Sequence, residues 1–132
     1  MRLEAEKLAP IENVTAKRLR AIILKLRHYG PSSFAALTDD DGNYLQVAGG
    51  GVTCMLERRE ASTGQTWRAF TNARSKAFPD GTILAFGGGE LKLLADEWLM
   101  APLVADAFEA FLHGRPLPEA ILWREHDLHA RR

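Results

Sequence analysis

The segment NYLQVAGGGVTCMLERRE, residues 43–60, decides the fold because it predicts two strands joined by three glycines. Successive side chains of a strand point to opposite faces. Leu45 and Val47 therefore share one face of the first strand, and Cys54 and Leu56 share one face of the second. The opposite faces carry a mixed set, which comprises Tyr44, Gln46, Thr53, Met55 and Glu57. One apolar and one mixed face are typical of an antiparallel sheet covered on one side only.

Turn signals connect this pair of strands to a third. The glycines at 49–51 can adopt positive φ without steric cost, which suits a short loop. Upstream, the sequence DDDGN at 39–43 predicts a turn, because Asp and Asn bond to their own backbone and Gly takes the left-handed position. The apolar stretch 34–38 before it predicts a strand. Residues 34–60 are therefore expected to form a three-stranded meander.

Two helices flank the predicted sheet. The first is predicted over 14–29, with an N-cap at Asn13 or Thr15 and a stop at Gly30. Its apolar stripe consists of Leu19, Ile22, Ile23 and Leu26. This spacing of i, i+3, i+4 and i+7 places one apolar face against the sheet. The second helix is predicted over 102–113 by the same kind of periodicity.

Short alternating segments predict the remaining strands, at 65–71, 82–86 and 90–94, and an edge strand at 120–124. We therefore expect one α+β domain over residues 1–132. It should contain a mostly antiparallel sheet of five to six strands, with an N-terminal and a C-terminal helix packed on it. Residues 1–12 and 125–132 are polar or charged and are expected to form a loose lead-in and a loose tail.

The composition of the chain excludes several classes of function. Seventeen Lys and Arg balance seventeen Asp and Glu, so no overall field favours nucleic acid or an anionic membrane. No apolar run approaches the ~20 residues that a bilayer span needs, and the charged N-terminal sequence lacks the apolar region of a secretory signal. A single cysteine excludes an internal disulfide. These features predict a cytoplasmic protein that binds neither membrane nor nucleic acid.

Several patterns resemble ligand sites but lack essential residues. A phosphate loop leads into a helix, whereas the glycine triplets at 49–51 and 87–89 are each followed by a strand pattern. The acidic turn that begins at Asp39 matches the opening of a calcium loop but lacks its later Gly and Glu. His126 and His129 would need a further ligand to bind a metal ion. We therefore predict no metal and no cofactor.

No catalytic residue is predicted either. Cys54 lies on the apolar strand face, where it acts as a small hydrophobe, and no histidine lies near it in the sequence. Asp96 and Glu97 are adjacent and point in different directions, which makes them a poor acid–base pair. The remaining candidate for chemistry is the region 87–97, as part of a small-molecule-binding or hydrolytic domain.

The mixed face of the meander is the strongest candidate for a binding surface. Tyr, Met and Arg are enriched at protein interfaces. The side chains expected to be exposed on this face are Tyr44, Gln46, Met55, Glu57 and Arg68. The alternative is that the second helix covers this face. The basic residues outside the apolar stripe of the first helix form either a solvated face or a surface for an anion or an acidic partner.

Two segments resemble small bacterial immunity proteins of polymorphic-toxin systems. The first is YLQVAGG at 44–50, which is followed by a strand ending in Leu-Glu. The second is FEAFLHG at 108–114, with Trp123 beyond it. The resemblance covers residues 34–124. It implies an α+β fold, a cytosolic protein and tight binding to a cognate toxin, and it carries over no catalytic residue.

These observations favour a non-enzymatic protein-binding module over an enzyme. The most specific form of this prediction is an immunity protein that neutralises a cognate toxin. The expected partner is another protein, and a homodimer is the other assembly that we consider. Tyr44 and Arg68 are the expected anchors, because tyrosine offers a large rigid contact and arginine a planar fork for an acidic partner. A change at Asp40, in the neighbouring turn, should matter far less.

Overall fold

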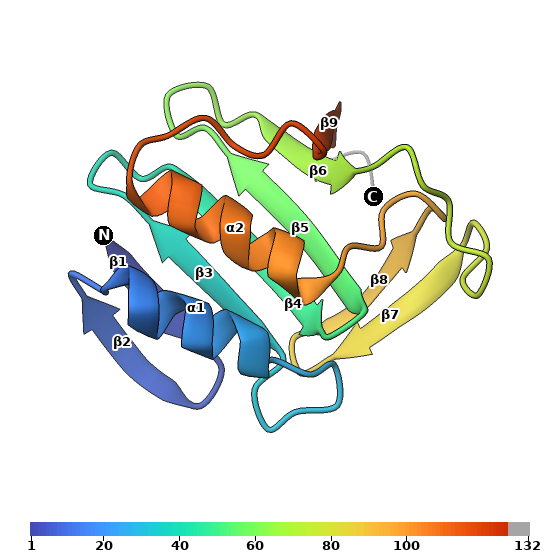
Figure 1. Ribbon diagram of the computed structural model, residues 1–132, viewed down its shortest axis with the longest axis horizontal. Coiled ribbons are helices and arrows are strands. Elements are labelled where there is room, and N and C mark those ends of the chain that lie inside the picture. Colours follow the sequence, from blue (N-terminus) through green and yellow to red (C-terminus); the bar gives the residue numbers. More distant parts are fainter. Residues whose placement is uncertain (127–132) are drawn as a thin grey trace.

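The structure, a computed structural model, describes residues 1–126 and has an α+β architecture (Figure 1). The strands are β1 (Arg2–Ala5), β2 (Leu8–Glu12), β3 (Phe34–Thr38), β4 (Tyr44–Gly50), β5 (Thr53–Arg59), β6 (Thr66–Phe70), β7 (Thr82–Phe86), β8 (Gly89–Leu93) and β9 (Leu122–Glu125). The helices are α1 (Ala16–Lys25) and α2 (Ala101–Leu112). Seven antiparallel strands form one sheet in the order β2-β1-β3-β4-β5-β6-β9, and β7 and β8 form a separate hairpin.

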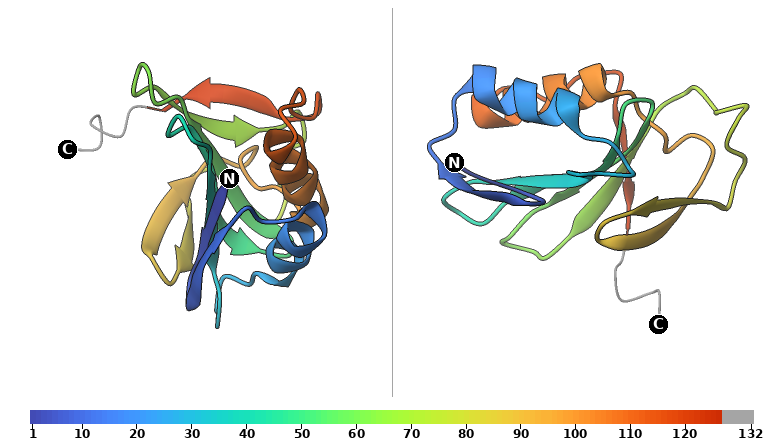
Figure 2. Two further views of the ribbon diagram at one scale, coloured as in Figure 1. Left: turned by 90° about the vertical axis from the view of Figure 1, so that its left-hand side faces the viewer. Right: turned by 90° about the horizontal axis from the view of Figure 1, so that it is seen from below.

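Both helices lie side by side on one face of the sheet, and the β7–β8 hairpin stands against the other face (Figure 2). The predicted N-cap of α1 is confirmed, because the side chain of Thr15 accepts a hydrogen bond from the backbone N–H of Arg18 at 3.3 Å. The helix is shorter than the predicted 14–29. It ends because the chain becomes extended at Leu26, where ψ is 144°.

The main core fills the space between the helices and the sheet. Its largest fully buried side chains include Phe108, Leu3, Leu19, Leu45, Leu56 and Val104. Burying one side chain of this size stabilises the fold by about 1.5–3 kcal/mol. An ion pair between Arg20 Nη1 and Asp106 Oδ1, 2.9 Å apart, also joins α1 to α2. The helices therefore cover the sheet face that the sequence predicts to be apolar.

The predicted meander is confirmed by β3, β4 and β5, with Gln46 of β4 opposite Glu57 of β5. The glycines at its turn also allow a close approach of the first helix. A Cβ at Gly50 would lie only 1.9 Å from the carbonyl oxygen of Leu26, the C-cap residue of α1. Only glycine permits this contact, because the neighbouring atom belongs to the backbone and cannot move aside.

The N-terminal segment differs from the prediction. Residues 1–12, expected as a loose lead-in, contain the β1–β2 hairpin, and β1 pairs with β3. Leu3 is fully buried, whereas Arg2 and Glu4 are exposed on the opposite face of the strand. The charged residues thus fit a strand with one polar face. The expectation of five to six strands is wrong, since the main sheet has seven and the hairpin adds two.

The C-terminal half contains the predicted elements, but their pairing was not foreseen. The strands expected at 82–86 and 90–94 are β7 and β8, which pair with each other outside the main sheet. The edge strand expected at 120–124 is β9, which pairs with β6. Most of the tail predicted over 125–132 lies outside the described residues. Within residues 1–126, no helix is both long enough and apolar enough to cross a membrane.

Candidate functional site

The mixed face of the sheet is only partly covered. The alternative that the second helix covers it is wrong, because both helices pack on the apolar face (Figure 2). The β7–β8 hairpin covers one half instead. Leu84 and Leu93 of the hairpin form a small core with Ala48 and Met55 of the meander. The mixed face therefore has a covered half and an uncovered half.

Only two of the five predicted binding residues are partly exposed. Tyr44 and Gln46 are half-buried, whereas Met55, Glu57 and Arg68 are 3%, 8% and 3% exposed. The predicted exposure of these three side chains is wrong. The hairpin and the segment that follows it pack over this half of the face. On this face, Tyr44, Gln46 and their exposed neighbours therefore remain as candidate contact residues for a partner.

Tyr44 links the uncovered and the covered parts of the mixed face. Its hydroxyl donates a hydrogen bond to Oε1 of Glu57 at 3.1 Å. Burial raises the pKa of the Tyr44 hydroxyl, and the carboxylate of Glu57 raises it further. The phenol is therefore neutral at neutral pH and remains a donor. This bond fixes the position of the ring at the surface.

A buried network of charged side chains closes the covered half of the mixed face. Nη1 of Arg68 lies 3.6 Å from Oε1 of Glu97 and donates to the carbonyl oxygen of Lys92 at 3.1 Å. Arg124 of β9 donates to Oε2 of Glu97 at 3.0 Å and makes two bonds to Asp96, of 3.2 and 3.0 Å. The hydrogen bond to Asp96 raises the pKa of Arg124. These contacts tie β6 and β9 to the segment before α2.

The same contacts weigh against chemistry in the region 87–97. Both oxygens of Glu97 are occupied, since Oε1 accepts from the backbone N–H of Leu94 at 2.7 Å and Oε2 is bound by Arg124. Glu97 is only 4% exposed. Both oxygens of Asp96 accept from Arg124, and the third carboxylate of this region, Glu90, lies exposed on the hairpin. None of these three carboxylates lines either of the two cavities described below.

The other candidates for chemistry also have structural roles. Cys54 is 1% exposed, and burial raises the pKa of its thiol to about 12, so it is not ionised at neutral pH. Nε2 of His126 lies 3.4 Å from Nη2 of Arg68. His129, the other histidine considered as a metal ligand, lies outside the described residues. In the part of the chain that the structure describes, no three His, Cys, Asp or Glu side chains gather as a metal site.

The uncovered half of the mixed face forms a shallow cavity of about 450 Å³, which we call the sheet groove. Its lining includes Glu4, Lys7, Leu8, Pro10, Phe34, Ala36 and Gln46. At the hairpin side, the ring of Phe34 meets Phe86 edge to face, with 6.0 Å between the ring centroids. The lining of the sheet groove thus combines apolar side chains with charged ones, and Glu4 and Gln46 lie directly beside Ala36.

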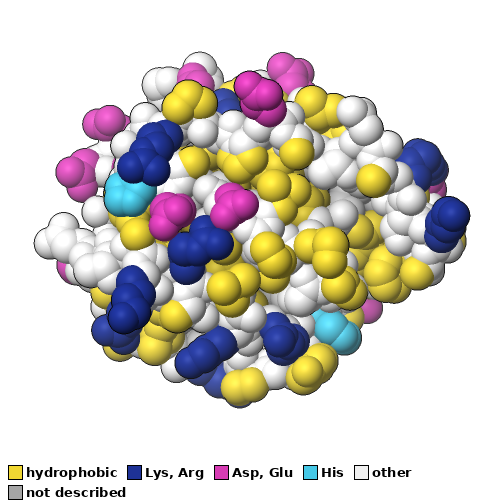
Figure 3. Space-filling view, in the orientation of Figure 1, with side chains coloured by type: hydrophobic (Ala, Val, Ile, Leu, Met, Phe, Trp, Pro, Cys, Tyr) yellow, Lys and Arg dark blue, Asp and Glu magenta, His cyan; other side chains and the backbone are white. Residues whose placement is uncertain are grey.

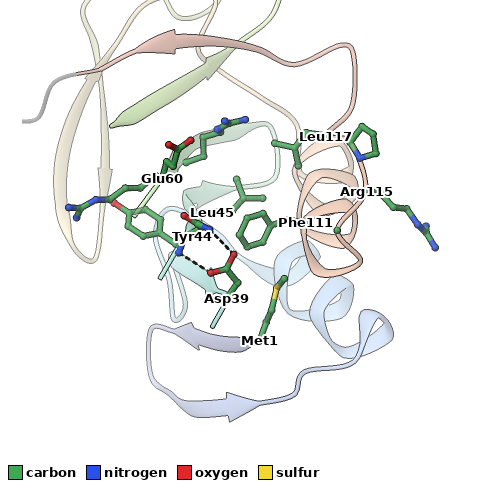
Figure 4. A pocket seen from close by; sticks show the side chains of 13 residues that line it. Met1, Asp39, Tyr44, Leu45, Glu60, Phe111, Arg115 and Leu117 are labelled. Atoms are coloured by element: carbon green, nitrogen blue, oxygen red, sulfur yellow. Dashed lines mark hydrogen bonds between the residues drawn. The ribbon is translucent and has the colours of Figure 1, made fainter. Parts of the chain in front are cut away.

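A second cavity, of about 460 Å³, opens beside the C-terminal end of α2 and is called the end cleft (Figure 4). Its apolar lining includes Met1, Leu45, Phe111 and Leu117. Its polar lining includes Asp39, Tyr44, Arg58, Arg59 and Glu60. Figure 4 shows the side chains of Met1, Leu45 and Phe111 turned toward one another, whereas Arg115 extends away. Tyr44 belongs both to this cleft and to the mixed face.

Arg58 is a residue of the end cleft that sequence reasoning missed. Its guanidinium carbon lies 4.6 Å from the ring centroid of Trp67 and 5.3 Å from that of Trp123. Arg58 and Trp67 are cross-strand partners in β5 and β6. Trp123 comes from β9, which lies far away in the sequence. The alternation of 65–71 could have placed Trp67 on the apolar face, but nothing in the sequence gives the pairing with β9.

The exposed surface of α1 is basic. Lys17, Arg18 and Lys25 are exposed, and the helix contains no acidic residue. Figure 3 shows a row of Lys and Arg side chains over α1, next to hydrophobic side chains between the two helices. The two predicted alternatives for this surface, a solvated face or a contact for an acidic partner, both fit this arrangement.

No protein-family model matches the chain, and no curated protein matches it. The resemblance to immunity proteins therefore stays a prediction.

Proposed function

We propose that this chain is a non-enzymatic protein-binding module whose interface is the uncovered half of the mixed sheet face. The observation that carries the proposal is the sheet groove, whose lining combines apolar side chains such as Leu8 and Phe34 with charged ones such as Lys7. An apolar centre surrounded by polar groups is the usual anatomy of a protein interface. Tyr44, two residues along β4 from Gln46, extends this surface toward the end cleft.

The resemblance of residues 44–50 and 108–114 to immunity proteins supports a more specific form of this proposal. In that form the partner is a toxin that the module neutralises by binding. The alternative, a hydrolytic or small-molecule-binding role for the region 87–97, is less well supported because both oxygens of Glu97 are already bonded. Of the two expected anchors, we retain Tyr44. We do not retain Arg68, which is only 3% exposed.

The test begins with a partner captured from the native cytosol on the tagged protein and identified by mass spectrometry. Dissociation constants are then measured with the purified pair. Tyr44→Ala removes an expected anchor and should weaken binding about thirtyfold, the effect of a typical hot-spot residue. Ala36→Arg places a long charged side chain on the floor of the sheet groove and should weaken binding at least as much. Asp40→Ala and Arg18→Met change exposed residues elsewhere and should bind like wild type.

All variants should first be shown to melt near the wild-type temperature. Wild-type affinity in both Tyr44→Ala and Ala36→Arg would place the interface elsewhere. If Arg18→Met alone weakens binding, the basic surface of α1 is the interface and the sheet groove is not. If no purified protein binds the chain with a measurable dissociation constant, the proposed function itself is wrong.

A further inference from the structure

The guanidinium of Arg58 lies over two aromatic rings, those of Trp67 and Trp123. Arg58 lies on the helix-covered face of β5, in the row that also contains Leu45 and Trp67. Trp67 and Trp123 both lie within the distance at which a cation is attracted to an aromatic ring. A guanidinium stacked on rings keeps its N–H donors at its edge, where they can bind a carboxylate with two parallel bonds.

No acidic partner occupies these donors. Within residues 1–126, the Arg58 guanidinium makes neither an ion pair nor a side-chain hydrogen bond. This distinguishes Arg58 from Arg20 and Arg124, whose guanidinium groups pair with carboxylates at 2.9 and 3.0 Å. An arginine remains charged at any physiological pH. The Arg58 side chain therefore presents a fixed positive charge to the end cleft.

The two carboxylates that line the end cleft are engaged elsewhere. Oδ1 of Asp39 accepts the backbone N–H groups of Asp41 and Asn43, each at 2.9 Å, and holds the β3–β4 turn. Figure 4 shows two of the hydrogen bonds of Asp39 as dashed lines. Oε1 of Glu60 accepts the hydroxyl of Ser62 at 3.1 Å. These bonds hold the carboxylates of Asp39 and Glu60 against neighbouring turn residues. Neither forms an ion pair with Arg58, so the cleft keeps a site for an external acid.

The apolar lining of the end cleft restricts what that acid can be. Met1, Phe111 and Leu117 form a surface that a small inorganic anion would leave uncovered. A cavity of about 460 Å³ has the size of ordinary ligand pockets. A peptide segment with an acidic residue beside an apolar one would satisfy both the charge and the apolar surface.

We propose that the end cleft receives an Asp or Glu side chain of the protein partner, paired with Arg58, and an apolar side chain next to it. The proposal rests on the proposed function, because it assumes a protein partner. Tyr44 lines the end cleft and Gln46 lines the sheet groove, so the two hollows lie two residues apart along β4. Because Arg58 lies on the opposite face of the sheet, a partner bound in the sheet groove reaches it by extending past Tyr44 around the end of β4.

The test uses the peptide acetyl-Leu-Asp-Phe-amide as the probe and its Asn analogue as the neutral match. Binding is followed by NMR through the indole N–H signals of Trp67 and Trp123. Trp98, which packs in the hairpin cluster, is the internal control. The Asp peptide should shift the signals of Trp67 and Trp123 with saturation and leave Trp98 unchanged. The Asn peptide should bind at least about tenfold more weakly, because it lacks a charge-assisted hydrogen bond.

The variant Arg58→Met keeps an unbranched side chain on the rings and removes the charge. It should bind the two peptides equally. Arg18→Met, the matched control on α1, should keep the wild-type preference for Asp. If Arg58→Met does not fold, Arg58→Lys serves instead. It keeps the charge but not the planar fork, and it should lose part of the preference.

Two results would overturn the proposal. One is the absence of a saturable shift of Trp67 and Trp123 in the wild type. The other is an undiminished preference for the Asp peptide in the folded Arg58 variant. A separate measurement tests the proposed interface: the native partner would bind Ala36→Arg and Tyr44→Ala with wild-type affinity if that interface were wrong. Peptide binding through Arg58 can succeed or fail independently of that measurement.

Discussion

Arg58 and Arg68 lie on neighbouring strands of one sheet but on opposite faces, and their surroundings differ. Arg68 is 3% exposed and lies 3.6 Å from a carboxylate oxygen of Glu97. The Arg58 guanidinium lies over the rings of Trp67 and Trp123 and has no ion pair within residues 1–126. In the first arrangement, the contact of Arg68 with Glu97 holds the segment before α2 on the sheet. The second holds the charge in place by ring contacts, without a carboxylate partner in the part of the chain that the structure describes.

The largest expected effect follows from removing an acid of the buried network. Glu97→Ala leaves Arg68 and Arg124 without this carboxylate, and it also removes the acceptor of the Leu94 N–H. Breaking a buried ion pair in this way typically costs about 3–5 kcal/mol. Urea unfolding should show this loss in the free energy of unfolding. Glu90→Ala removes an exposed carboxylate nearby and should unfold like wild type; equal stability of the two variants would mean that the network does not close the fold.

The second prediction concerns the apolar contacts between the β7–β8 hairpin and the mixed face. Leu93 of β8 is 1% exposed in the small core between the hairpin and the sheet. Leu93→Ala should lower the free energy of unfolding by about 2–3 kcal/mol, at the low end of values for buried leucines because this core is small. Denaturant unfolding followed by tryptophan fluorescence checks the value. A loss below about 0.5 kcal/mol would indicate that the hairpin is not firmly packed on the mixed face.

The third prediction concerns Cys54, on the helix-covered face, and the stability of the protein at alkaline pH. The pKa of the Cys54 thiol is raised from 9.0 to about 12 in the folded protein, mainly by burial. The stability due to the protonated thiol is fully present below about pH 9. It falls above that pH by about 1.4 kcal/mol per pH unit, because only the unfolded thiol ionises there.

Urea unfolding between pH 7 and 11 measures this dependence. Cys54→Ala should remove most of the fall above pH 9. The raised pKa of Tyr44 acts in the same direction at higher pH, so a smaller fall should persist in that variant. An unchanged pH dependence in Cys54→Ala would show that the thiol is not the group responsible.

The smallest expected effect is that of Arg58 on stability. Arg58→Met loses the attraction between the guanidinium and the two rings, which contributes about 1 kcal/mol. Arg18→Met, in which the lost charge is exposed, should unfold like wild type. Urea unfolding of both variants completes the comparison. A loss of 3 kcal/mol or more, as expected for Glu97→Ala, would place Arg58 with Arg68 among the residues that close the fold.

Local patterns in the sequence were sufficient for the helices and the meander. The stripe that includes Leu19 and Ile23 and the alternation around Val47 each depend on neighbours within a few residues. The strand at 2–5 was missed because Arg2 and Glu4 made the segment look like a polar lead-in. Only the pairing with β3 reveals that these charges line one face of a strand whose other face is buried.

The candidate site was predicted less well, because it depends on contacts between distant segments. Tyr44 and Gln46 were correctly placed on a partly open face, since alternation within one strand decides the direction of their side chains. The burial of Met55 and Arg68 depends on where the β7–β8 hairpin and the segment after it pack. The leucines of that hairpin alternate as in any strand, so its own sequence does not reveal which face it covers. The position of Trp123 beside Arg58 likewise requires the pairing of β9 with β6.

The order of the strands has a consequence during protein synthesis. β6 leaves the ribosome long before its neighbour β9, because the hairpin and α2 are translated between them. Since N-terminal parts of a chain generally fold first, the meander can form while the outer edge of β6 is still unpaired. An unpaired strand edge readily pairs with other chains. We expect a nascent chain that stops before residue 122 to be prone to aggregation and to lack the second aromatic ring beside Arg58.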